Sequence, residues 1–324
     1  MRNFAHVNAR SIDEAVSFLR RYGDKADVIA GGTDLLGKMK DEILPRYPEA
    51  LINIKTIPGL EFIKEKGGVL RLGALMRLED IGKDSMIGER YTALAEAAER
   101  TASPHIREMG TIGGNICQDI RCWYYRNPHN RFPCLRKGGG RCYAIEGDNR
   151  YHSIFGGSVE EGCYAVHPSD MAPALIALDG RVKTSKRIMN AEDFFEVGVK
   201  KTTVLDKDEI VTEIEIPTPS DDTKSAFIKF AIRKSIDFPI VNCAAMIARN
   251  GDRVSNARIC LNAVYVKPYR AEKAEEAILG KVINEENAEV AGSSAISDAK
   301  PLRDNRYMVH IAKTLIQRTI LACK

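Results

Sequence analysis

Two short glycine stretches indicate what kind of fold this 324-residue chain adopts. The first is Ala30-Gly-Gly-Thr-Asp-Leu35 and the second is Thr111-Ile-Gly-Gly-Asn115. Glycine lets the backbone approach a ligand closely, and successive free N–H groups form a concavity that binds anions. Neither stretch has the GxGxxG or GxxxxGK[ST] pattern, so we expect neither a Rossmann nor a P-loop site. Two such loops could grip one diphosphate between them, although two tight turns would have the same sequence pattern.

Regular structure is predicted on both sides of each stretch. Ser11-Ile-Asp-Glu14 is a capping-box pattern and starts the first helix. From apolar periodicity, helices are expected over 11–21, 90–102, 170–178, 268–279 and 305–322. Strands are expected at 26–30, 51–55, 69–73, 181–184, 210–216, 226–233, 240–248 and 257–265. The stretch 217–222 has the composition of a linker, and the strands and then helices beyond it indicate an α+β domain.

Composition excludes several classes of protein. Hydrophobic residues make up 44% and charged residues 28% of the chain, as in ordinary globular domains. No run of about 18 apolar residues exists, so no membrane span is expected. The N-terminus lacks the apolar core of a secretory signal, which favours a cytoplasmic location. The 48 Lys and Arg exceed the 44 Asp and Glu by only four, which argues against nucleic-acid binding.

Five of the eight cysteines gather in one region: Cys117, Cys122, Cys134, Cys142 and Cys163. In a reducing compartment such a cluster points to metal binding or redox chemistry rather than to disulfides. The spacing is not that of a zinc ribbon, whereas an iron–sulfur cluster needs four cysteines and accepts varied gaps. Two alternatives stay open: zinc with His129, His152 or His167 as a ligand, and small buried residues that hold nothing.

Further segments occur in an order that resembles a known family. His167-Pro-Ser-Asp-Met-Ala-Pro-Ala-Leu175, Ile210-Val-Thr-Glu-Ile-Glu-Ile-Pro217 and Phe227-Ile-Lys-Phe-Ala-Ile-Arg233 follow the two glycine stretches. Together these segments resemble the FAD-binding medium subunit of the xanthine dehydrogenase, or molybdenum hydroxylase, family. The resemblance covers nearly the whole chain.

The cysteine region narrows the resemblance. The insertion between Asn115 and Asp170, which opens with Cys117-Gln-Asp-Ile-Arg-Cys122, is similar to that of the β subunit of 4-hydroxybenzoyl-CoA reductase, which carries a 4Fe–4S cluster besides FAD. By that pattern the cluster ligands would be Cys122, Cys134, Cys142 and Cys163. Cys117 would be a spare thiol. The gap before Cys134 is shorter and the gap before Cys163 is longer than the pattern implies, so Cys163 is the least secure ligand.

The resemblance implies an α+β fold of two domains. The first, residues 1–219, would be a two-lobed FAD-binding domain of the PCMH type, with lobes at about 1–57 and 58–219 and a Cys-rich insertion at 117–163. The second, residues 220–324, would be a smaller α+β domain of the CO dehydrogenase flavoprotein type.

The resemblance also implies where FAD would lie, namely between the two lobes. Backbone N–H groups of both glycine stretches would hold the diphosphate, Asp170 would contact ribityl or ribose hydroxyls, and Val211 and Lys229 would approach the flavin ring. The implied contacts are Ile29, Ala30, Gly31, Gly32, Thr33, Asp34, Leu35, Ala102, Thr111, Gly113, Gly114, Asn115, Asp170, Val211 and Lys229.

The implied function is electron transfer within a molybdenum-dependent oxidoreductase. A large molybdopterin subunit would carry out the substrate chemistry, so no catalytic residue is expected on this chain. A small subunit with two 2Fe–2S clusters and an external carrier, ferredoxin or NAD(P), would complete the path. The implied reaction is that of a 4-hydroxybenzoyl-CoA reductase. The alternatives are a xanthine, heterocycle or aldehyde dehydrogenase, a stand-alone flavoprotein with structural zinc, and a scaffold protein without FAD.

Overall fold

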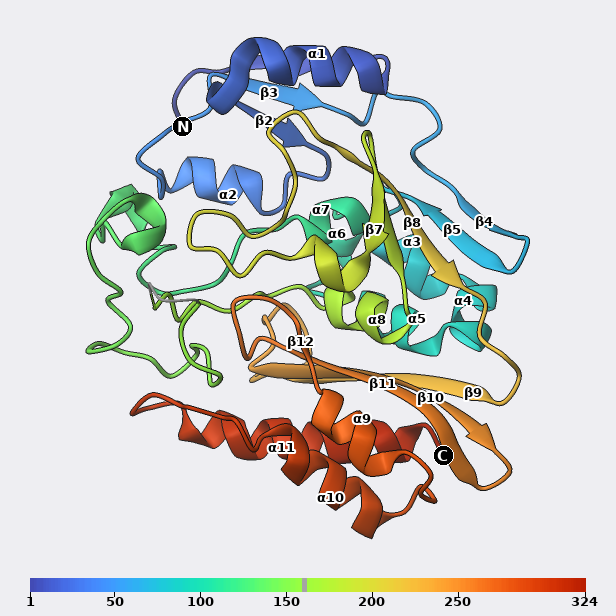
Figure 1. Cartoon of the computed structure of the whole chain (residues 1–324). Helices are drawn as coiled ribbons and strands as arrows, with labels where there is room; N and C mark the ends of the chain where they lie inside the picture. Colours follow the sequence, from blue (N-terminus) through green and yellow to red (C-terminus); the bar gives the residue numbers. More distant parts are fainter. Residues whose placement is uncertain (159–161) are drawn as a thin grey trace.

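Three bodies, each built on its own β-sheet, are stacked in the computed structural model, which describes residues 1–158 and 162–324 (Figure 1). The N-terminal lobe lies at one end, a central lobe lies in the middle, and the C-terminal sheet with its helices lies at the other end. The chain enters the central lobe after β3, leaves it after β8, and forms the third body from there to the C-terminus.

The N-terminal lobe contains a parallel sheet in the order β1 (Ala5–Asn8), β3 (Ala50–Asn53), β2 (Ala26–Ile29). The central strand β3 is buried along its whole length. Helix α1 (Ile12–Tyr22) begins as predicted, because the Ser11 hydroxyl accepts a hydrogen bond from Glu14 N. The 3₁₀ turn η1 (Gly23–Lys25) and helix α2 (Leu35–Lys40) complete the lobe.

The central lobe contains an antiparallel sheet in the order β4 (Ile63–Lys66), β5 (Val69–Gly73), β8 (Val211–Pro217), β6 (Arg181–Thr184), β7 (Ile188–Asn190). Strand β8 alternates as its sequence predicts. Ile214 and Ile216 lie fully in the core, while Glu213 and Glu215 point to the other face. There Lys183 and Arg181 of the neighbouring strand pair with these carboxylates at 3.2 and 3.1 Å.

Short helices cover one face of this sheet. They are α3 (Leu78–Lys83), α4 (Ser85–Arg90), α5 (Thr92–Glu99), α6 (Pro104–Arg107), α7 (Ile112–Ile116), α8 (Met171–Ala177) and the 3₁₀ turn η4 (Ala191–Phe194). The single helix predicted over 90–102 is therefore wrong in its bounds. The chain leaves helical geometry at the fully buried Tyr91 (φ −126°, ψ 46°), which separates α4 from α5.

The C-terminal body contains an antiparallel sheet in the order β12 (Tyr269–Arg270), β11 (Arg253–Asn262), β10 (Val241–Asn250), β9 (Thr223–Phe230). Helices α9 (Glu272–Ile278), α10 (Glu285–Ala295) and α11 (Arg306–Ala322) cover its outer face. The inner face contributes Phe227, Ala244 and Cys260 to the core of the central lobe. No helix in the described part of the chain is both long and apolar enough to cross a bilayer.

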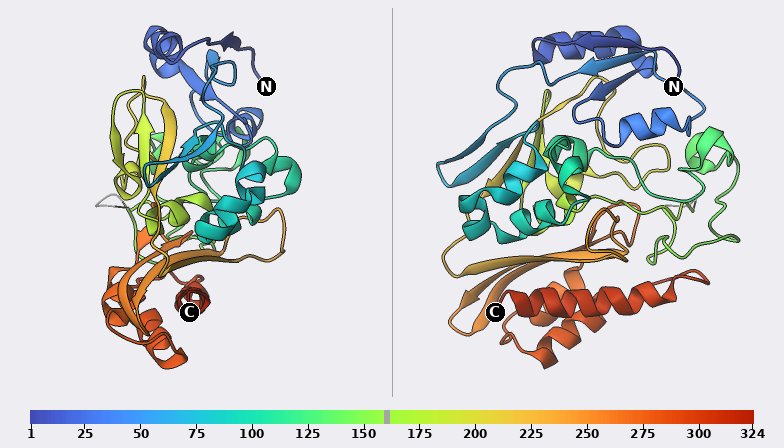
Figure 2. Two further views of the ribbon diagram at one scale, coloured as in Figure 1. Left: turned by 90° about the vertical axis from the view of Figure 1, so that its right-hand side faces the viewer. Right: turned by 180° about the vertical axis from the view of Figure 1, so that it is seen from behind.

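The cysteine segment, residues 117–158, is irregular as predicted and contains only the 3₁₀ turns η2 (Pro128–Asn130) and η3 (Leu135–Lys137). It lies at one edge of the molecule, beside α2 and the C-terminal body (Figures 1 and 2). Asn305 Nδ2 donates to the carbonyls of His152 and Ser153 at 2.8 and 3.0 Å, and His129 N donates to Asp41 O at 2.8 Å. Residues 159–161 of the predicted insertion lie outside the described residues.

Replacing Ile214 by alanine tests the assignment of β8 as the centre of the fold. The side chain is fully buried, so we expect Ile214→Ala to lower the free energy of unfolding by about 2–5 kcal/mol in urea titrations. The matched control is Ile188→Ala on edge strand β7, where the side chain is 51% exposed and the change should stay within about 0.5 kcal/mol. Equal losses in the two variants would contradict the assignment.

Candidate functional site

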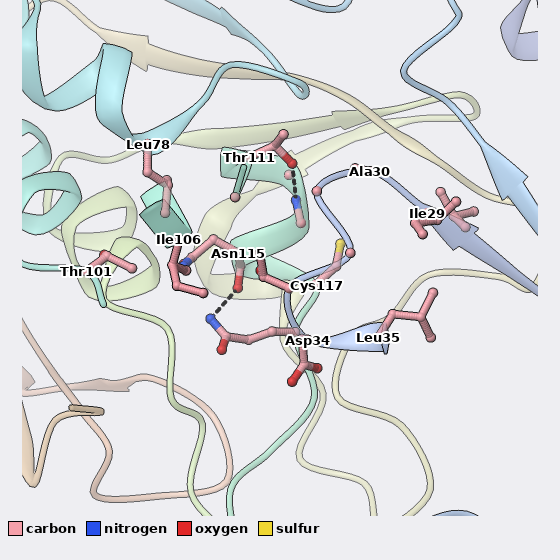
Figure 3. Close-up of a pocket in the computed structure, with 18 of the residues that line it drawn as sticks. Ile29, Ala30, Asp34, Leu35, Leu78, Thr101, Ile106, Thr111, Asn115 and Cys117 are labelled. Carbon is pink, nitrogen blue, oxygen red and sulfur yellow. Dashed lines mark hydrogen bonds between the residues drawn. The ribbon is translucent and has the colours of Figure 1, made fainter. Parts of the chain in front are cut away.

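A cavity of about 540 Å³ lies where the N-terminal lobe, the central lobe and a loop of the C-terminal body meet. Both glycine stretches line it, together with Ile236 and Phe238 of the third body (Figure 3). Nearly all the site residues predicted from the sequence line this one cavity: Ile29, Ala30, Gly31, Gly32, Thr33, Asp34, Leu35, Ala102, Thr111, Gly113, Gly114, Asn115, Asp170 and Val211. Lys229 does not line it.

The first glycine stretch has the properties of an anion-binding loop. A methyl group on Gly31 would collide with the carbonyl oxygen of Met109, so the two loops approach each other as only glycine permits. Gly32 has φ +71°, in the left-handed region. Among the described residues, the N–H groups of 31–34 donate to no protein acceptor. These N–H groups are therefore available to a diphosphate.

The second glycine stretch is not the open loop that the sequence predicted. It forms the helix α7, which the Thr111 hydroxyl caps by accepting from Gly114 N at 3.2 Å. Gly113 N donates to Ala74 O at 2.9 Å and Asn115 N donates to Thr111 O at 2.8 Å. The three N–H groups predicted to hold a diphosphate thus already have protein partners. This stretch supplies a closely packed wall of the cavity, with the side chain of Asn115 directed along it (Figure 3).

Asp34 joins the first glycine stretch to the cysteine segment. Its carboxylate accepts hydrogen bonds from Arg126 Nη1 at 2.7 Å, from Arg121 Nη2 at 3.0 Å and from Asp119 N at 3.0 Å. Burial acts to raise the pKa of Asp34, but the cations Arg126, Lys38 and Arg121 outweigh burial and hold the pKa below its ordinary value. The Asp34 side chain therefore anchors residues 119–126, and only its backbone faces a ligand.

Asp170 lies at the start of α8, 3% exposed, where the central and C-terminal bodies meet. Lys229 Nζ lies 2.7 Å from one carboxylate oxygen, and Asn242 Nδ2 donates to the other at 2.7 Å. Burial raises the pKa of Asp170, while Lys229 and Asn242 act against that rise. Lys229 was predicted to approach a flavin ring, and in the structure its Nζ forms a buried ion pair with Asp170.

The four predicted cluster ligands lie in one neighbourhood. Burial raises the pKa of the Cys122 thiol to about 12, and the nearby thiols of Cys163 and Cys142 act in the same direction. The pKa of Cys134 is raised by burial and by Cys142. Cys122, Cys134 and Cys163 pack together in one apolar cluster. Cys117 instead lines the cavity, and Cys243, Cys260 and Cys323 are buried elsewhere.

The metal geometry itself is not formed. In the part of the chain that the structure describes, no three His, Cys, Asp or Glu side chains are arranged as a metal site. Among the histidines named as alternative zinc ligands, His152 is the one beside a cysteine, with Nε2 3.2 Å from Cys122 Sγ. His167 is buried against Phe195 and Asn262.

Sequence reasoning missed several residues around the thiols. Arg121 and Arg126 bind Asp34, and the amine of Lys137 is buried near Cys134 and Cys122. A compositional signal for them exists, because residues 117–158 contain seven Lys and Arg but three Asp and Glu. Trp123, the single tryptophan of the chain, is 51% exposed and lines a second cavity of about 630 Å³ with Tyr151 and Phe238.

The Asp170–Lys229 pair gives a stability prediction. Lys229→Met would leave a buried carboxylate without its cation, so we expect the free energy of unfolding to fall by about 3–5 kcal/mol in urea titrations. The double variant Lys229→Met/Asp170→Asn should recover part of this loss. Lys224→Met, at an exposed position of the same strand, should change the free energy by less than about 0.5 kcal/mol. A double variant no more stable than Lys229→Met would refute the pairing.

Two known protein families match the chain, one over each of its two parts. Residues 2–219 match the family described as the FAD binding domain in molybdopterin dehydrogenase. Residues 226–323 match the CO dehydrogenase flavoprotein C-terminal domain. The fold predicted from the sequence, an FAD-binding domain followed by this C-terminal domain, is thereby confirmed.

Individual relatives match along nearly their whole length. The aldehyde oxidoreductase FAD-binding subunit PaoB of Escherichia coli is 32% identical over 97% of this chain and 96% of its own. The carbon monoxide dehydrogenase medium chain of Hydrogenophaga pseudoflava is 29% identical over 98% and 96%. A structure of the carbon monoxide dehydrogenase from that organism, one that lacks the Mo-pyranopterin moiety of the molybdenum cofactor, superposes with a TM-score of 0.79, 27% identity and coverage of 99% and 97%. The chain therefore belongs to the family of FAD-binding medium subunits of molybdenum hydroxylases.

Proposed function

We propose that this chain transfers electrons through FAD and a 4Fe–4S cluster within a molybdenum-dependent oxidoreductase. The observation that most supports the proposal is that four cysteine thiols lie in one region, next to the cavity that the glycine stretches line. Asp34 belongs to one stretch and binds Arg121 and Arg126, which flank Cys122 in sequence. The two sites are therefore joined by one network of buried ion pairs.

The residues that line the cavity suit FAD. The N–H groups of 31–34, which have no protein acceptor within residues 1–158 and 162–324, would hold the diphosphate, and the close approach at Gly31 keeps that loop against Met109. Asp170, lining the cavity, would accept from ribityl or ribose hydroxyls, and Val211 would lie beside the flavin ring. Bound FAD exchanges one or two electrons, which lets it connect two-electron and one-electron carriers.

The kinds of donor in the thiol neighbourhood, rather than their arrangement, favour an iron–sulfur cluster over zinc. The donors are four cysteines without a carboxylate, and Cys134 and Cys163 are buried among apolar residues. The amine of Lys137 is buried near Cys134 and Cys122, and it has no hydrogen-bond partner among the described residues. Such a cluster passes single electrons.

The partners that we propose are a large molybdopterin subunit and a small subunit with two 2Fe–2S clusters. The medium-chain relatives support this, since the similar carbon monoxide dehydrogenase structure is described by its molybdenum cofactor. An external carrier such as ferredoxin or NAD(P) would exchange electrons with this chain. Substrate chemistry would take place on the molybdopterin subunit, and no residue of this chain would be catalytic.

Two substrate classes have a specific observation in their favour. The similarity to the aldehyde oxidoreductase subunit favours aldehyde oxidation. The four-cysteine insertion favours reductive dehydroxylation of an aromatic acyl-CoA, as in 4-hydroxybenzoyl-CoA reductase. Testing the purified complex with an aldehyde and with 4-hydroxybenzoyl-CoA would separate the two classes, and turnover of a purine or another heterocycle would indicate the third alternative.

The first glycine stretch is tested by adding one methyl group. Gly31→Ala should push the loop away from Met109 and weaken FAD binding at least tenfold, or about 1.4 kcal/mol. The measurements are the flavin-to-protein ratio and an FAD titration of the reconstituted chain. Gly37→Ala in α2 is the matched control, since open space surrounds that position, and it should bind FAD like the unmodified chain. Unchanged FAD affinity in Gly31→Ala would contradict the proposed diphosphate site.

The cluster is tested by metal analysis of the complex purified without oxygen. We expect about eight irons per complex, of which the two 2Fe–2S clusters of the small subunit account for about four and a four-cysteine cluster on this chain for the rest, with broad absorption near 400 nm beside the flavin bands. Cys134→Ser should lose the iron of this chain. Cys117→Ser should keep it, because Cys117 lines the cavity of the glycine stretches and is not one of the four proposed ligands. Zinc in place of iron would support the stand-alone flavoprotein with structural zinc, and a chain that takes up no flavin would support the scaffold alternative.

A further inference from the structure

We infer that the outer face of the central sheet is the docking surface for an acidic electron-carrier protein. This outer face is the one opposite the short helices, and its strands carry five cations: Lys64, Lys66, Arg71, Arg181 and Lys183. The inference rests on the proposed function, since it concerns the external carrier that would exchange electrons with this chain.

Strand register places these cations on one face. Lys64 of β4 lies opposite Arg71 of β5, and Arg71 lies opposite Glu215 of β8. Glu215 in turn lies opposite Arg181 of β6. Directly opposite residues of antiparallel strands share a face, and so do residues two positions apart on one strand. The remaining two cations stand two residues along β4 and β6, so they belong to the same face.

The carboxylates of the outer face are buried beneath its cations. Glu215, which is 4% exposed, pairs with Arg181 at 3.1 Å, and Glu213, which is 8% exposed, pairs with Lys183 at 3.2 Å. Arg71 lies 3.5 Å from Glu213 and 3.6 Å from Glu215. The side chains of these three cations are 38–46% exposed. A partner that approaches the sheet therefore meets positive charge first.

The two lysines of β4 add positive charge that nothing offsets. Lys64 and Lys66 are exposed and form no ion pair within residues 1–158 and 162–324. Five cations thus share the outer face with two carboxylates, an excess of three. Lysine on an edge strand such as β4 can prevent unwanted pairing, but Lys64 also stands opposite Arg71, and like charges directly opposite each other destabilise a sheet. Binding of an acidic partner would offset that cost.

The side chains of the outer face favour a transient protein partner. Ile188 is the one large hydrophobic residue that is exposed on the five strands, whereas permanent interfaces are more apolar. Complementary charge speeds the encounter of two proteins more than it tightens the complex, which suits a carrier that must arrive and leave. None of the five strands contains an aromatic residue, so the bases of a nucleic acid would have no side chain to stack on.

The outer face also extends to the cavity of the glycine stretches. Val211, which lines that cavity, is the first residue of β8, and Glu213 follows two residues later. At a rise of about 3.3 Å per residue, the two positions are about 7 Å apart. A carrier docked over Glu213 and its cations would therefore lie close to a cofactor in the cavity.

The experiment measures the binding of two carrier proteins to the purified complex at low and high salt. The acidic probe is a bacterial two-cluster ferredoxin, and the basic probe is cytochrome c. Lys64→Glu/Lys66→Glu reverses two exposed charges without breaking an ion pair. Arg21→Glu/Lys281→Glu is the matched control, since it changes the net charge equally at two exposed positions outside the sheet. FAD content is measured first, because a complex without FAD would defeat the proposed function rather than this inference.

We expect ferredoxin to bind the unmodified complex, more weakly as salt rises, and cytochrome c not to bind. Lys64→Glu/Lys66→Glu should weaken ferredoxin binding at least tenfold, and the control should bind like the unmodified complex. Three results would overturn the inference: no binding of ferredoxin to the unmodified complex, equal affinity in the unmodified complex and Lys64→Glu/Lys66→Glu, or equal weakening in both variants. Loss of a partner subunit from Lys64→Glu/Lys66→Glu would also overturn it, because the outer face would then belong to a permanent interface.

Discussion

The part-buried carboxylate of Asp34 is the contact on which the architecture of the site depends. It accepts from two guanidinium groups and one backbone N–H of the cysteine segment, while its own backbone belongs to the first glycine stretch. Hydrogen bonds to charged groups of this kind each contribute about 1.5–3 kcal/mol. The segment has little regular structure, so ion pairs and hydrogen bonds, rather than a sheet or helix, determine its position.

A second buried pair closes the cavity from the other side. Lys229 and Asn242 come from β9 and β10, yet their partner Asp170 begins a helix of the central lobe. The cavity therefore has walls from all three bodies, and each wall is fixed by a buried charge or a close glycine contact. A ligand in this cavity would therefore contact the assembled chain rather than the glycine stretches alone.

Much of the fold could be predicted from the sequence, because its strands alternate and its caps are local. Strand β8 and the Ser11 cap of α1 are examples in which neighbouring residues decide the structure. Helix α10 was missed, since its buried face is made of Ala288, Ala291, Gly292 and Ala295, which give a weak hydrophobic pattern. The helix at Thr111 was missed because two of its five residues are glycine, which disfavours helix, and because the acceptor of Gly113 N, Ala74 O, lies in a distant part of the sequence. The pairing of Lys229 with Asp170, 59 residues apart, likewise has no local signal.

The distribution of charge explains why the cysteine segment can lie beside a flavin site. Residues 117–158 hold seven of the 48 basic and three of the 44 acidic residues, which leaves 41 of each in the rest of the chain. The excess of basic over acidic residues in this segment, which is four, thus equals the net charge of the whole chain. Arg121 and Arg126 neutralise Asp34 beside the loop that would take a diphosphate, and the amine of Lys137 is buried near Cys134 and Cys122. An excess of positive charge there favours the diphosphate of FAD, and it would also favour the thiolate cluster proposed above. A neutral segment of the same length would have to bury both groups at the full cost of desolvation.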